Sequence, residues 1–328
     1  MMKKVRALGL SSGGLDSILA ALVLRRQGIE VSWVAFETPF FDAENARKAA
    51  LAHGIPFRVV DITGVYLPML KAPAAGYGKA MNPCKDCHAL MFHEAGRIME
   101  AEGFDFLFSG EVSGQRPMSQ TRSALRYVEK RAGYEGRILR PLSARNLPPT
   151  QVEEEGRVDR SQLLDFQGRG RKPQLALARE LGVRDFPAPA GGCLLTDVTF
   201  GKRLKDLMTH DPEAKPTDYH LLKNGRHFRL SPEVKLVVGR TQADNAALAV
   251  HFDARLHTRI QTLNFPGPLA FLCGPAGQQE RRLAAGLVAG YTRAADSVSV
   301  TLVLDGCGGE EKVDVLPVRS PEIREKMV

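Results

Sequence analysis

Two groups of residues in this sequence have types and spacings that can carry chemistry. One is a glycine-rich run at 12–17 (SGGLDS), between a short apolar segment and a stretch with a helical pattern. The other consists of thiols: Cys84 and Cys87 enclose two residues in the run NPCKDC, and Cys193 follows the run PAPAGG. Glycine-rich turns at helix starts bind anions, and closely spaced thiols bind metals or carry sulfur. The sequence therefore points to phosphate chemistry and to thiol chemistry.

The glycine-rich run has the features of a phosphate-binding loop. Gly13 and Gly14 let the backbone approach a ligand without a Cβ in the way. The helix that follows offers unpaired N–H groups and the positive end of its dipole. Ser12 and Ser17 add hydroxyl donors, and Asp16 can hold the Mg²⁺ that accompanies a nucleotide or orient the loop. The run lacks the Gly-Lys-Ser/Thr ending of kinase-type loops, and the alternative is a tight turn that opens an ordinary helix.

The thiols leave several chemistries open. The spacing of Cys84 and Cys87 at a helix start lets both face one metal or cluster, and a helix N-terminus lowers thiol pKa. A lone pair of this spacing is also half a zinc site or a redox pair. The five cysteines are an odd number, which argues against a disulfide framework in a reducing compartment. Cys273 and Cys307 have no partners at a suitable spacing, so we expect them to be structural.

A parallel sheet is the scaffold that the pattern predicts. Strand patterns alternate with helical patterns, and the expected strands are 5–10, 31–36, 57–61, 104–109 and 137–142, with helices at 18–27, 43–53, 89–102 and 174–181. Such alternation favours an α/β, doubly wound parallel sheet with right-handed crossovers. The run 12–17 then lies at the carboxyl end of the first strand, where ligands bind in such sheets. The segment 141–170 interrupts the pattern, and we expect an excursion that carries function or faces RNA.

The sequence resembles a known family in three places. The run 12–17 is similar to the SGGxDS signature of PP-loop ATP pyrophosphatases, which split ATP between its α and β phosphates. Members differ in the nucleophile, which is ammonia, lysine or sulfur. The block 108–121 (FSGEVSGQRPMSQT), together with the loop and the NPCxxC run, resembles tRNA 4-thiouridine synthetases of the ThiI type over roughly residues 1–200. This resemblance implies a HUP-type domain that uses ATP and Mg²⁺, with Gly110 and Gln115 beside the nucleotide.

The resemblance also implies how sulfur is delivered. In members without a dedicated persulfide domain, two near cysteines and one distant cysteine hold a [4Fe-4S] cluster whose open iron carries exogenous sulfide. Cys84, Cys87 and Cys193 match that pattern, so with Asp16 they are the expected catalytic residues, and the three thiols are the expected metal ligands. The alternative drops the cluster: Cys193 carries a persulfide, and Cys84 or Cys87 resolves it as a disulfide. The rhodanese and THUMP domains of the best-known members are not evident in the sequence.

The carboxy-terminal part has a different pattern. Short strands follow residue 200, so we expect a PP-loop domain at 1–200 and a smaller α+β domain at 201–328. The segment 225–245, which contains Gly225-Arg226 and Asp244-Asn245, resembles the RNA-binding domain of NFACT proteins. The alternative is a β-hairpin with a basic turn. The resemblance implies that this domain holds the RNA.

Charge favours an anionic partner. The formal net charge is +8, and basic residues are dense between 116 and 145. We expect tRNA phosphates to be bound by Arg116, Arg122, Arg126, Lys130, Arg131, Arg169, Arg171, Lys172, Arg226 and Arg240. No apolar run is long enough to span a bilayer and no signal peptide is evident, so a cytoplasmic protein with no membrane partner is expected.

These observations lead to one hypothesis and two alternatives. The hypothesis is an ATP-dependent tRNA uridine sulfurtransferase with sulfide or a persulfide donor as a second partner, and a homodimer is allowed. An RNA-binding protein with a degenerate nucleotide site is the alternative from another class. The other alternative is an amidotransferase, but that function would not explain the cysteines.

Overall fold

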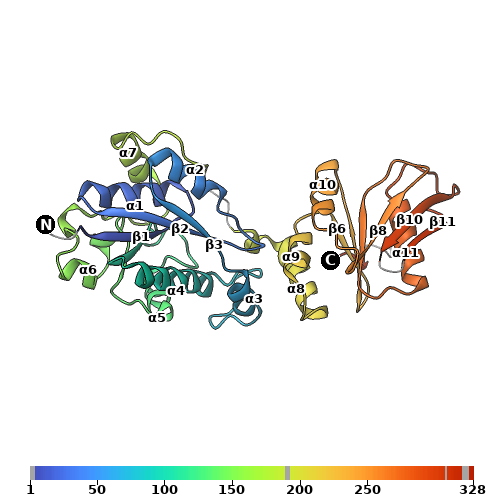
Figure 1. Cartoon of the computed structure of the whole chain (residues 1–328), viewed down its shortest axis with the longest axis horizontal. Helices are drawn as coiled ribbons and strands as arrows, with labels where there is room; N and C mark the ends of the chain where they lie inside the picture. Colours follow the sequence, from blue (N-terminus) through green and yellow to red (C-terminus); the bar gives the residue numbers. More distant parts are fainter. Residues whose placement is uncertain (1–3, 189–192, 307–308, 320–324) are drawn as a thin grey trace. The chain divides into compact units, whose positions relative to one another are not determined.

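The computed structural model describes residues 4–188, 193–306, 309–319 and 325–328, and the chain forms two compact units, Met1–Thr196 and Asp197–Val328 (Figure 1). The division falls at Asp197, whose side chain accepts a hydrogen bond from the Phe200 N–H at 2.7 Å and so begins the first helix of the second unit. The sequence placed this boundary four residues later, at 200–201.

The first unit is built on a five-stranded parallel sheet. Its strands are β1 (Arg6–Leu10), β2 (Glu30–Glu37), β3 (Phe57–Asp61), β4 (Phe106–Ser109) and β5 (Ile138–Leu139), in the order β3-β2-β1-β4-β5. All five strands are parallel. The β2 and β3 strands lie on one side of β1, and β4 and β5 lie on its other side, so the order in which strands are added reverses between β1 and β4. The expected doubly wound α/β fold is confirmed.

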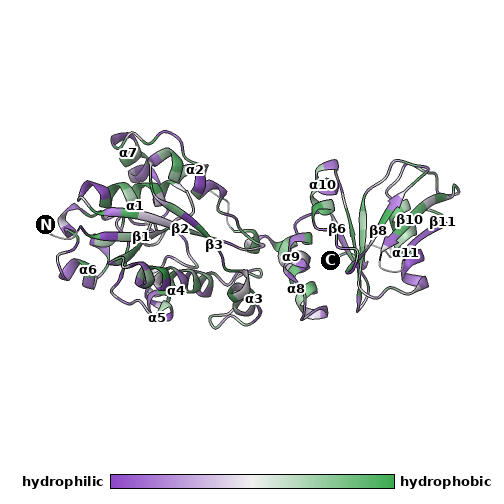
Figure 2. Ribbon diagram, in the orientation of Figure 1, coloured by the Kyte–Doolittle hydropathy of each residue, from purple (hydrophilic) through white to green (hydrophobic). Residues whose placement is uncertain are grey.

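Helices cover both faces of this sheet (Figure 1). They are α1 (Leu15–Arg26), α2 (Glu44–His53), α3 (Thr63–Lys71), α4 (Cys84–Glu102), α5 (Arg122–Ala132), α6 (Gln151–Glu154) and α7 (Lys172–Glu180), with short 3-10 turns at Ala144–Asn146, Arg160–Gln162 and Leu194–Thr196. The α1 and α7 helices pack together, as do α4 and α5. Apolar residues run along the strands and the inward faces of these helices (Figure 2), and Leu19, Trp33 and Phe106 are almost fully buried between the layers.

The segment 141–170 packs back onto the core of the first unit. Val152, Val158 and Leu163 are buried in the same apolar cluster as α1 and β1. The excursion expected from the sequence is therefore largely structural, and only part of it faces solvent.

The second unit is an antiparallel sheet with helices. Its elements are α8 (Val198–His210), α9 (Pro216–Leu221), β6 (Arg226–Ser231), β7 (Val234–Val238), α10 (Gln242–Val250), β8 (His257–Thr262), β9 (Ala270–Cys273), α11 (Gln278–Ala289), β10 (Val300–Gly306) and β11 (Gly309–Val315). The strands are ordered β11-β10-β8-β9-β7-β6. One core forms between this sheet and α11, around Leu287, Val288 and Leu302. The expected α+β unit is confirmed.

Candidate functional site

The loop 11–14 lies where the sheet reverses its order. It follows β1, and the loop 110–115 follows β4, whose Ser109 is paired in register with Leu10 of β1. The two loops therefore leave the carboxyl ends of adjacent strands at the reversal point, where open α/β sheets bind their ligands. This is where the sequence placed the nucleotide.

Glycines allow the two loops to pack closely. Gly13 has φ +72°, and a Cβ on it would lie 2.2 Å from the backbone of Asn45, at the start of α2. A Cβ on Gly110 would lie 2.4 Å from the backbone of Asp16. The Gly13 N–H donates to Ser11 Oγ at 3.2 Å, and Gly14 precedes α1 without a side-chain cap. The first N–H groups of α1 therefore remain available to an anion.

Asp16 is the charged group of this loop. Gln115 Nε2 donates to Asp16 Oδ2 at 3.0 Å, while Asp16 Oδ1 and Gln115 Oε1 are buried and have no hydrogen-bond partner among the residues that the structure describes. Burial raises the pKa of Asp16, and Gln115, Arg171 and Arg116 oppose that effect. A buried carboxylate oxygen without a partner fits a Mg²⁺ ligand, because oxygen ligands are what Mg²⁺ prefers. Ser12 is exposed and Ser17 is buried.

An ion-pair network lies beside this loop. Glu111 is 7% exposed. Its Oε2 accepts a hydrogen bond from Arg140 Nε at 2.9 Å, and its Oε1 lies 2.9 Å from His88 Nδ1. Arg140, 3% exposed, also pairs with Glu129. Burial alone would raise the pKa of Glu111, but Arg140 and His88 lower it to about 2. Because His88 follows Cys87 on α4, this network holds the thiol-bearing helix against the loop after β4.

Two of the thiols lie at the start of α4 as expected. Asn82 Nδ2 donates to Cys84 Sγ at 3.2 Å, and the Tyr66 hydroxyl donates to Cys87 Sγ at 3.5 Å. Tyr66 is fully buried and contacts the rings of Phe40 and Phe41. Asp86, between the two thiols, accepts from Ala75 N at 2.7 Å and from Tyr127 at 2.8 Å. The packing therefore fixes the CxxC turn from both sides.

The lowered pKa that was expected for thiols at a helix N-terminus is wrong for Cys87. Burial raises the pKa of Cys87 to about 12, opposite to the lowering expected at a helix N-terminus. The Cys193 side chain is exposed, yet partial desolvation of its sulfur raises its pKa, and Cys84 and Arg116 act on it as weaker charges.

The donor set suits a cluster, since thiols are the ligands of iron–sulfur centres. Within the described ranges, however, no three His, Cys, Asp or Glu side chains stand close enough to hold a metal ion. Residues 189–192, which lead to Cys193, lie outside those ranges.

Comparisons with known proteins agree with this geometry. A family model described as "Thiamine biosynthesis protein (ThiI)" matches residues 3–146, and one described as "NFACT protein RNA binding domain" matches residues 225–327. The chain is ThiI-like, with an NFACT-type carboxy-terminal domain. A tRNA-specific 2-thiouridylase of Clostridium acetobutylicum is 32% identical over 133 residues, which are 34% of this chain and 36% of that protein.

Two further relatives extend the comparison of this ThiI-like chain. A probable tRNA sulfurtransferase of Acholeplasma laidlawii is 32% identical over 145 residues, covering 42% of this chain and 34% of that protein. A solved 4-thiouridine synthetase–RNA complex with bound ATP is 21% identical with a TM-score of 0.38, over 55% of this chain and 41% of that one. The chain thus spans about a third of the length of the curated relatives it matches.

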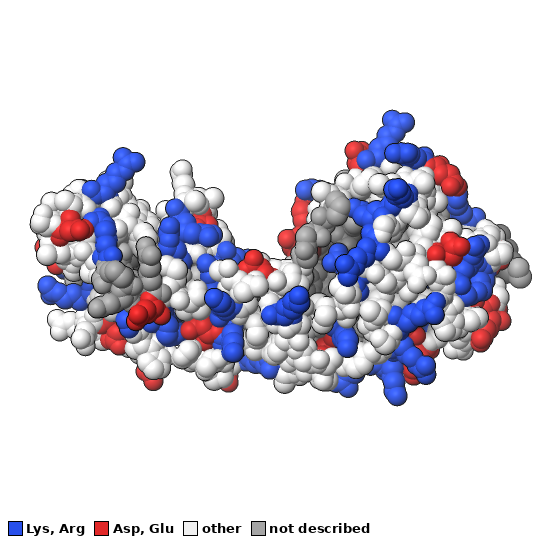
Figure 3. Space-filling view, turned by 180° about the vertical axis from the view of Figure 1, so that it is seen from behind, with Lys and Arg blue, Asp and Glu red and all other residues white. Residues whose placement is uncertain are grey.

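The expected RNA-binding residues divide into three sets. Arg122, Arg126 and Lys130 lie one turn apart on the exposed face of α5, with Arg131 beside them and Leu125 and Val128 on the buried face. Lysine and arginine outnumber acidic side chains on the face of the molecule in Figure 3.

In the second set, Arg116 and Arg171 are charges that lower the pKa of Asp16, while Arg169 and Lys172 are exposed. Arg140, counted with the basic run, is buried in an ion pair and is not available to phosphate.

The third set lies in the NFACT-type domain of this ThiI-like chain. Asp244 Oδ2 accepts from Gly225 N at 3.3 Å and from Arg240 N at 3.1 Å, so the two halves of the Gly-Arg and Asp-Asn motif meet. Arg240 is exposed, and Arg226 lies over the Tyr291 ring at 4.6 Å from its centroid. The β-hairpin that was the alternative interpretation is present as β6 and β7, and it forms part of the segment that matches the NFACT-type domain.

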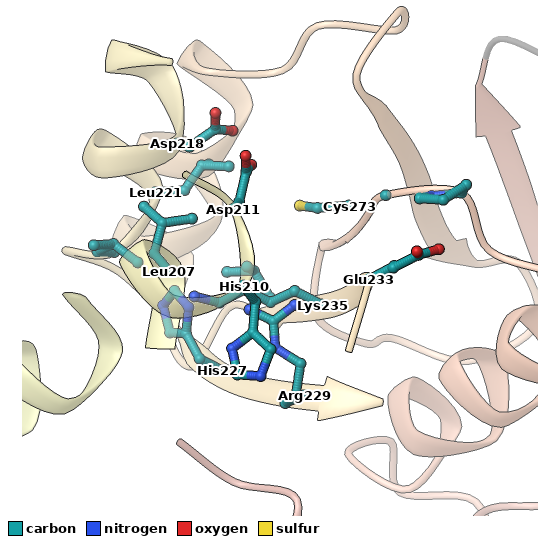
Figure 4. A pocket seen from close by; sticks show the side chains of 14 residues that line it. Leu207, His210, Asp211, Asp218, Leu221, His227, Arg229, Glu233, Lys235 and Cys273 are labelled. Carbon is teal, nitrogen blue, oxygen red and sulfur yellow. The ribbon is translucent and has the colours of Figure 1, made fainter. Parts of the chain in front are cut away.

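A separate cavity of about 400 Å³ lies in the same domain (Figure 4). Its floor is charged: Arg229 pairs with Asp206 at 2.6 Å, and buried Lys235 lies 3.3 Å from the same carboxylate. Cys273, paired in register with Lys235, also lines it, and burial raises the pKa of Cys273 to about 12. This agrees with the structural role expected for Cys273; Cys307 lies outside the described residues.

No role was predicted for Tyr66 or Asn82, although both form hydrogen bonds to the thiols. Asn82 could have been found from its place in the NPCxxC run. Tyr66 lies in α3, which contains Pro68 and was not predicted as a helix. No helix among the described residues is long and apolar enough to cross a membrane.

Proposed function

We propose that this chain is an ATP-dependent tRNA sulfurtransferase that activates a uridine carbonyl and replaces its oxygen with sulfur. The observation that carries the proposal is that the loop after β4 contacts both groups: Gln115 donates to Asp16 of the glycine-rich loop, and Glu111 is bonded to His88, which follows Cys87 on α4. An ATP-binding loop and a thiol group then serve one reaction centre. The family relatives act on tRNA by their names, which supports tRNA as the substrate.

The first step is adenylation. The uridine carbonyl oxygen attacks the α-phosphorus of ATP, and the bond to the β-phosphate oxygen breaks to release pyrophosphate. The N–H groups of Gly14 and the first turn of α1 would stabilise the charge that develops on pyrophosphate, and Gly13, whose N–H is bonded to Ser11, would let the loop approach it. Arg116 and Arg171 add positive charge beside Asp16, and Asp16 Oδ1 would hold Mg²⁺.

The second step replaces the activated oxygen. Sulfur bonds to the same uridine carbon, and the carbon–oxygen bond breaks with AMP as the leaving group. Activation is required because the carbonyl oxygen alone is a poor leaving group. Gly110 holds the β4 loop against α1, and Glu111 holds α4 against that loop. This chain's residues therefore keep the thiols in fixed relation to the adenylate.

Cys84, Cys87 and Cys193 would hold a [4Fe-4S] cluster. When bound, such a cluster supplies an open iron site for sulfide. Asn82 and Tyr66 contact two of the three sulfurs and orient them. Iron content separates this version from a cluster-free one, because single Cys→Ala variants at all three positions must lose iron after anaerobic purification.

The cluster-free version is favoured by the exposure of Cys193. Here the outer sulfur of a Cys193 persulfide, supplied by a persulfide donor, attacks the activated carbon and AMP leaves. Cys84 or Cys87 then attacks the Cys193 sulfur, which forms a disulfide and breaks the bond to the transferred sulfur, so that the thiolated uridine is released. Retention of full activity without iron would establish this version, and a Cys193→Ala variant would then lack all sulfur transfer.

Turnover of ATP to AMP with tRNA and sulfide tests the whole proposal. We expect AMP and a thiolated nucleoside by mass spectrometry, and loss of both in Asp16→Asn. Glu180→Gln, the same acid-to-amide change at an exposed position of α7, is the matched control and should be active. Absence of AMP formation by the wild-type protein, with tRNA binding retained, would instead favour an RNA-binding protein with a degenerate nucleotide site.

A further inference from the structure

A second cavity in the carboxy-terminal unit has a different lining from the charged one in Figure 4. It encloses about 420 Å³, within the usual range of about 300–1,000 Å³ for small-ligand pockets. It lies between the start of α10, the end of β8 and the segment before β9. The residues that matter for its chemistry are Gln242, Asn245, Gln261, Thr262 and Phe265.

The wall of this cavity is fixed by internal contacts. Asn245 Oδ1 accepts from Leu269 N at 3.3 Å, and a Cβ on Gly239 would lie 2.0 Å from the same oxygen. The carboxamide oxygen of Asn245 is therefore engaged, which leaves its amide N–H groups as donors. Gly267 packs so closely on Thr262 that a Cβ would lie 2.7 Å from its hydroxyl. Phe265 is half-buried against the apolar core, so its ring is held in place.

The chemistry of the lining is neutral. No Asp, Glu, Lys or Arg lines this cavity, whereas the cavity in Figure 4 is lined by Asp211, Asp218, Glu233, Arg229 and Lys235. Carboxamides offer donors and acceptors together, and Gln and Asn pair with the edges of bases for that reason. An aromatic ring adds a surface on which a base can stack. The lining therefore offers no positive charge to a phosphate. An unpaired base could form hydrogen bonds with the carboxamides and stack on the Phe265 ring.

Cations lie next to the cavity rather than inside it. Arg240 is exposed and precedes Gln242 by two residues. Arg259 lies two residues before Gln261 on β8, so both side chains are on one face of the sheet. Arg240 pairs with Asp244 at 2.9 Å and Arg259 pairs with Asp305 at 2.6 Å, so a phosphate must compete with a carboxylate at either position. Contacts of this kind would keep phosphates apart from the base in the cavity, as nucleic-acid interfaces generally do.

We propose that this cavity holds one unpaired nucleobase of a bound RNA, with Gln242 and Gln261 contacting the base edge and Phe265 its face. The inference rests on the proposed RNA-binding role of this unit and adds base selectivity to it. The neutral lining favours this occupant over a phosphate or a charged peptide.

Fluorescence anisotropy with labelled single-stranded RNA tests the proposal in the full-length protein. The probes are homopolymers of each of the four bases and an abasic ribose-phosphate strand, each about ten nucleotides long, within the range that single-strand-binding domains cover. We expect one base to bind roughly five- to fifty-fold more tightly than the abasic strand. The double variant Gln242→Ala and Gln261→Ala should lose this preference while its affinity for the abasic strand is unchanged.

Gln279→Ala provides the matched control, since Gln279 is an exposed glutamine of α11 outside the cavity. It should retain the preference, and an equal loss in this control would overturn the assignment of the cavity. Equal affinity of the wild-type protein for all five strands, with tRNA sulfur transfer intact, would overturn the base site and leave the proposed function standing. Absence of binding to any RNA, tRNA included, would overturn both.

Discussion

Glu111 is a buried carboxylate that connects the thiol-bearing helix to the sheet. Its contacts come from His88 on α4 and from Arg140, the first residue after β5. Removing one partner of a buried ion pair is costly because the other charge is left without compensation, and typical losses are about 3–5 kcal/mol. The position therefore links local electrostatics to the placement of Cys84 and Cys87.

We expect the stability of the protein to depend on pH through Glu111. Its pKa in the folded protein is about 2, against an ordinary value of 4.5. A carboxyl whose pKa is lowered by folding stabilises the fold fully above its unfolded pKa, and that contribution is lost as pH falls from about 4.5 toward 2. The lost contribution is about 3 kcal/mol. Urea unfolding at several pH values measures it.

The Glu111→Gln variant checks that assignment. It should be less stable near neutral pH and should lack the Glu111 component of the acid dependence. Glu180→Gln is the control, because the Arg26–Glu180 pair is exposed and such pairs contribute about 0–1 kcal/mol. An acid dependence that is the same in Glu111→Gln as in the wild type would contradict the argument.

The loop before α1 offers a prediction at the level of the element. In Gly13→Ala, the Cβ meets the backbone of Asn45 and Ala46 in addition to the strain of a positive φ. The loop must therefore move away from α2, and we expect ATP-to-AMP turnover to fall at least tenfold, the equivalent of about 1.4 kcal/mol. Turnover and thermal unfolding are both measured.

Gly28→Ala separates strain from steric conflict. Gly28 has a similar φ of +77° at the other end of α1, but nothing lies within 4 Å of its Cβ position. It should lose roughly 1–2 kcal/mol of stability from the left-handed backbone and retain turnover. Equal turnover in the two variants would show that the fit of the loop against α2 is unimportant.

The exposed face of α5 yields a second prediction at this level. Arg122, Arg126 and Lys130 repeat every fourth residue, and such a row can follow a phosphate backbone. Replacing all three by Gln should weaken tRNA binding. The slope of the logarithm of the binding constant against the logarithm of the salt concentration should become smaller by the amount expected for about three phosphate contacts. Filter binding across salt concentrations measures this. The same change at Lys4, Lys48 and Arg184, which are exposed elsewhere on the unit, should leave the salt dependence nearly unchanged.

Elements with regular patterns could be predicted from the sequence, and those shaped by tertiary contacts could not. The strand 57–61 was placed correctly, and α4 was predicted from 89 although it begins at Cys84. The β8 strand was missed because half of its residues are polar and partly exposed, and α3 was missed because Pro68 lies within it. The position of Gln115 beside Asp16 followed only from a resemblance, since nothing local in the sequence brings residues 99 positions apart together.

At the scale of the whole molecule, each unit has a large core of its own among the described residues. One lies around α1 and β1, and the other lies between α11 and the antiparallel sheet. A unit with its own core is expected to fold without the other. The glycine-rich loop and Cys84, Cys87 and Cys193 belong to the first unit, whereas the NFACT-type match belongs to the second. Activation chemistry and RNA holding are therefore expected to be separable.

Truncation after Thr196 tests this division, because Asp197 caps α8 and belongs with the second unit. We expect residues 1–196 to remain folded and to retain ATP binding through the loop at 12–17. Their affinity for tRNA should fall at least tenfold, since the basic face of α5 would be the main remaining contact. Isothermal titration with ATP and filter binding with tRNA measure the two properties on the same preparation. Unchanged tRNA affinity in the truncated protein would mean that α5 and its neighbours hold the RNA, and that the second unit has another task.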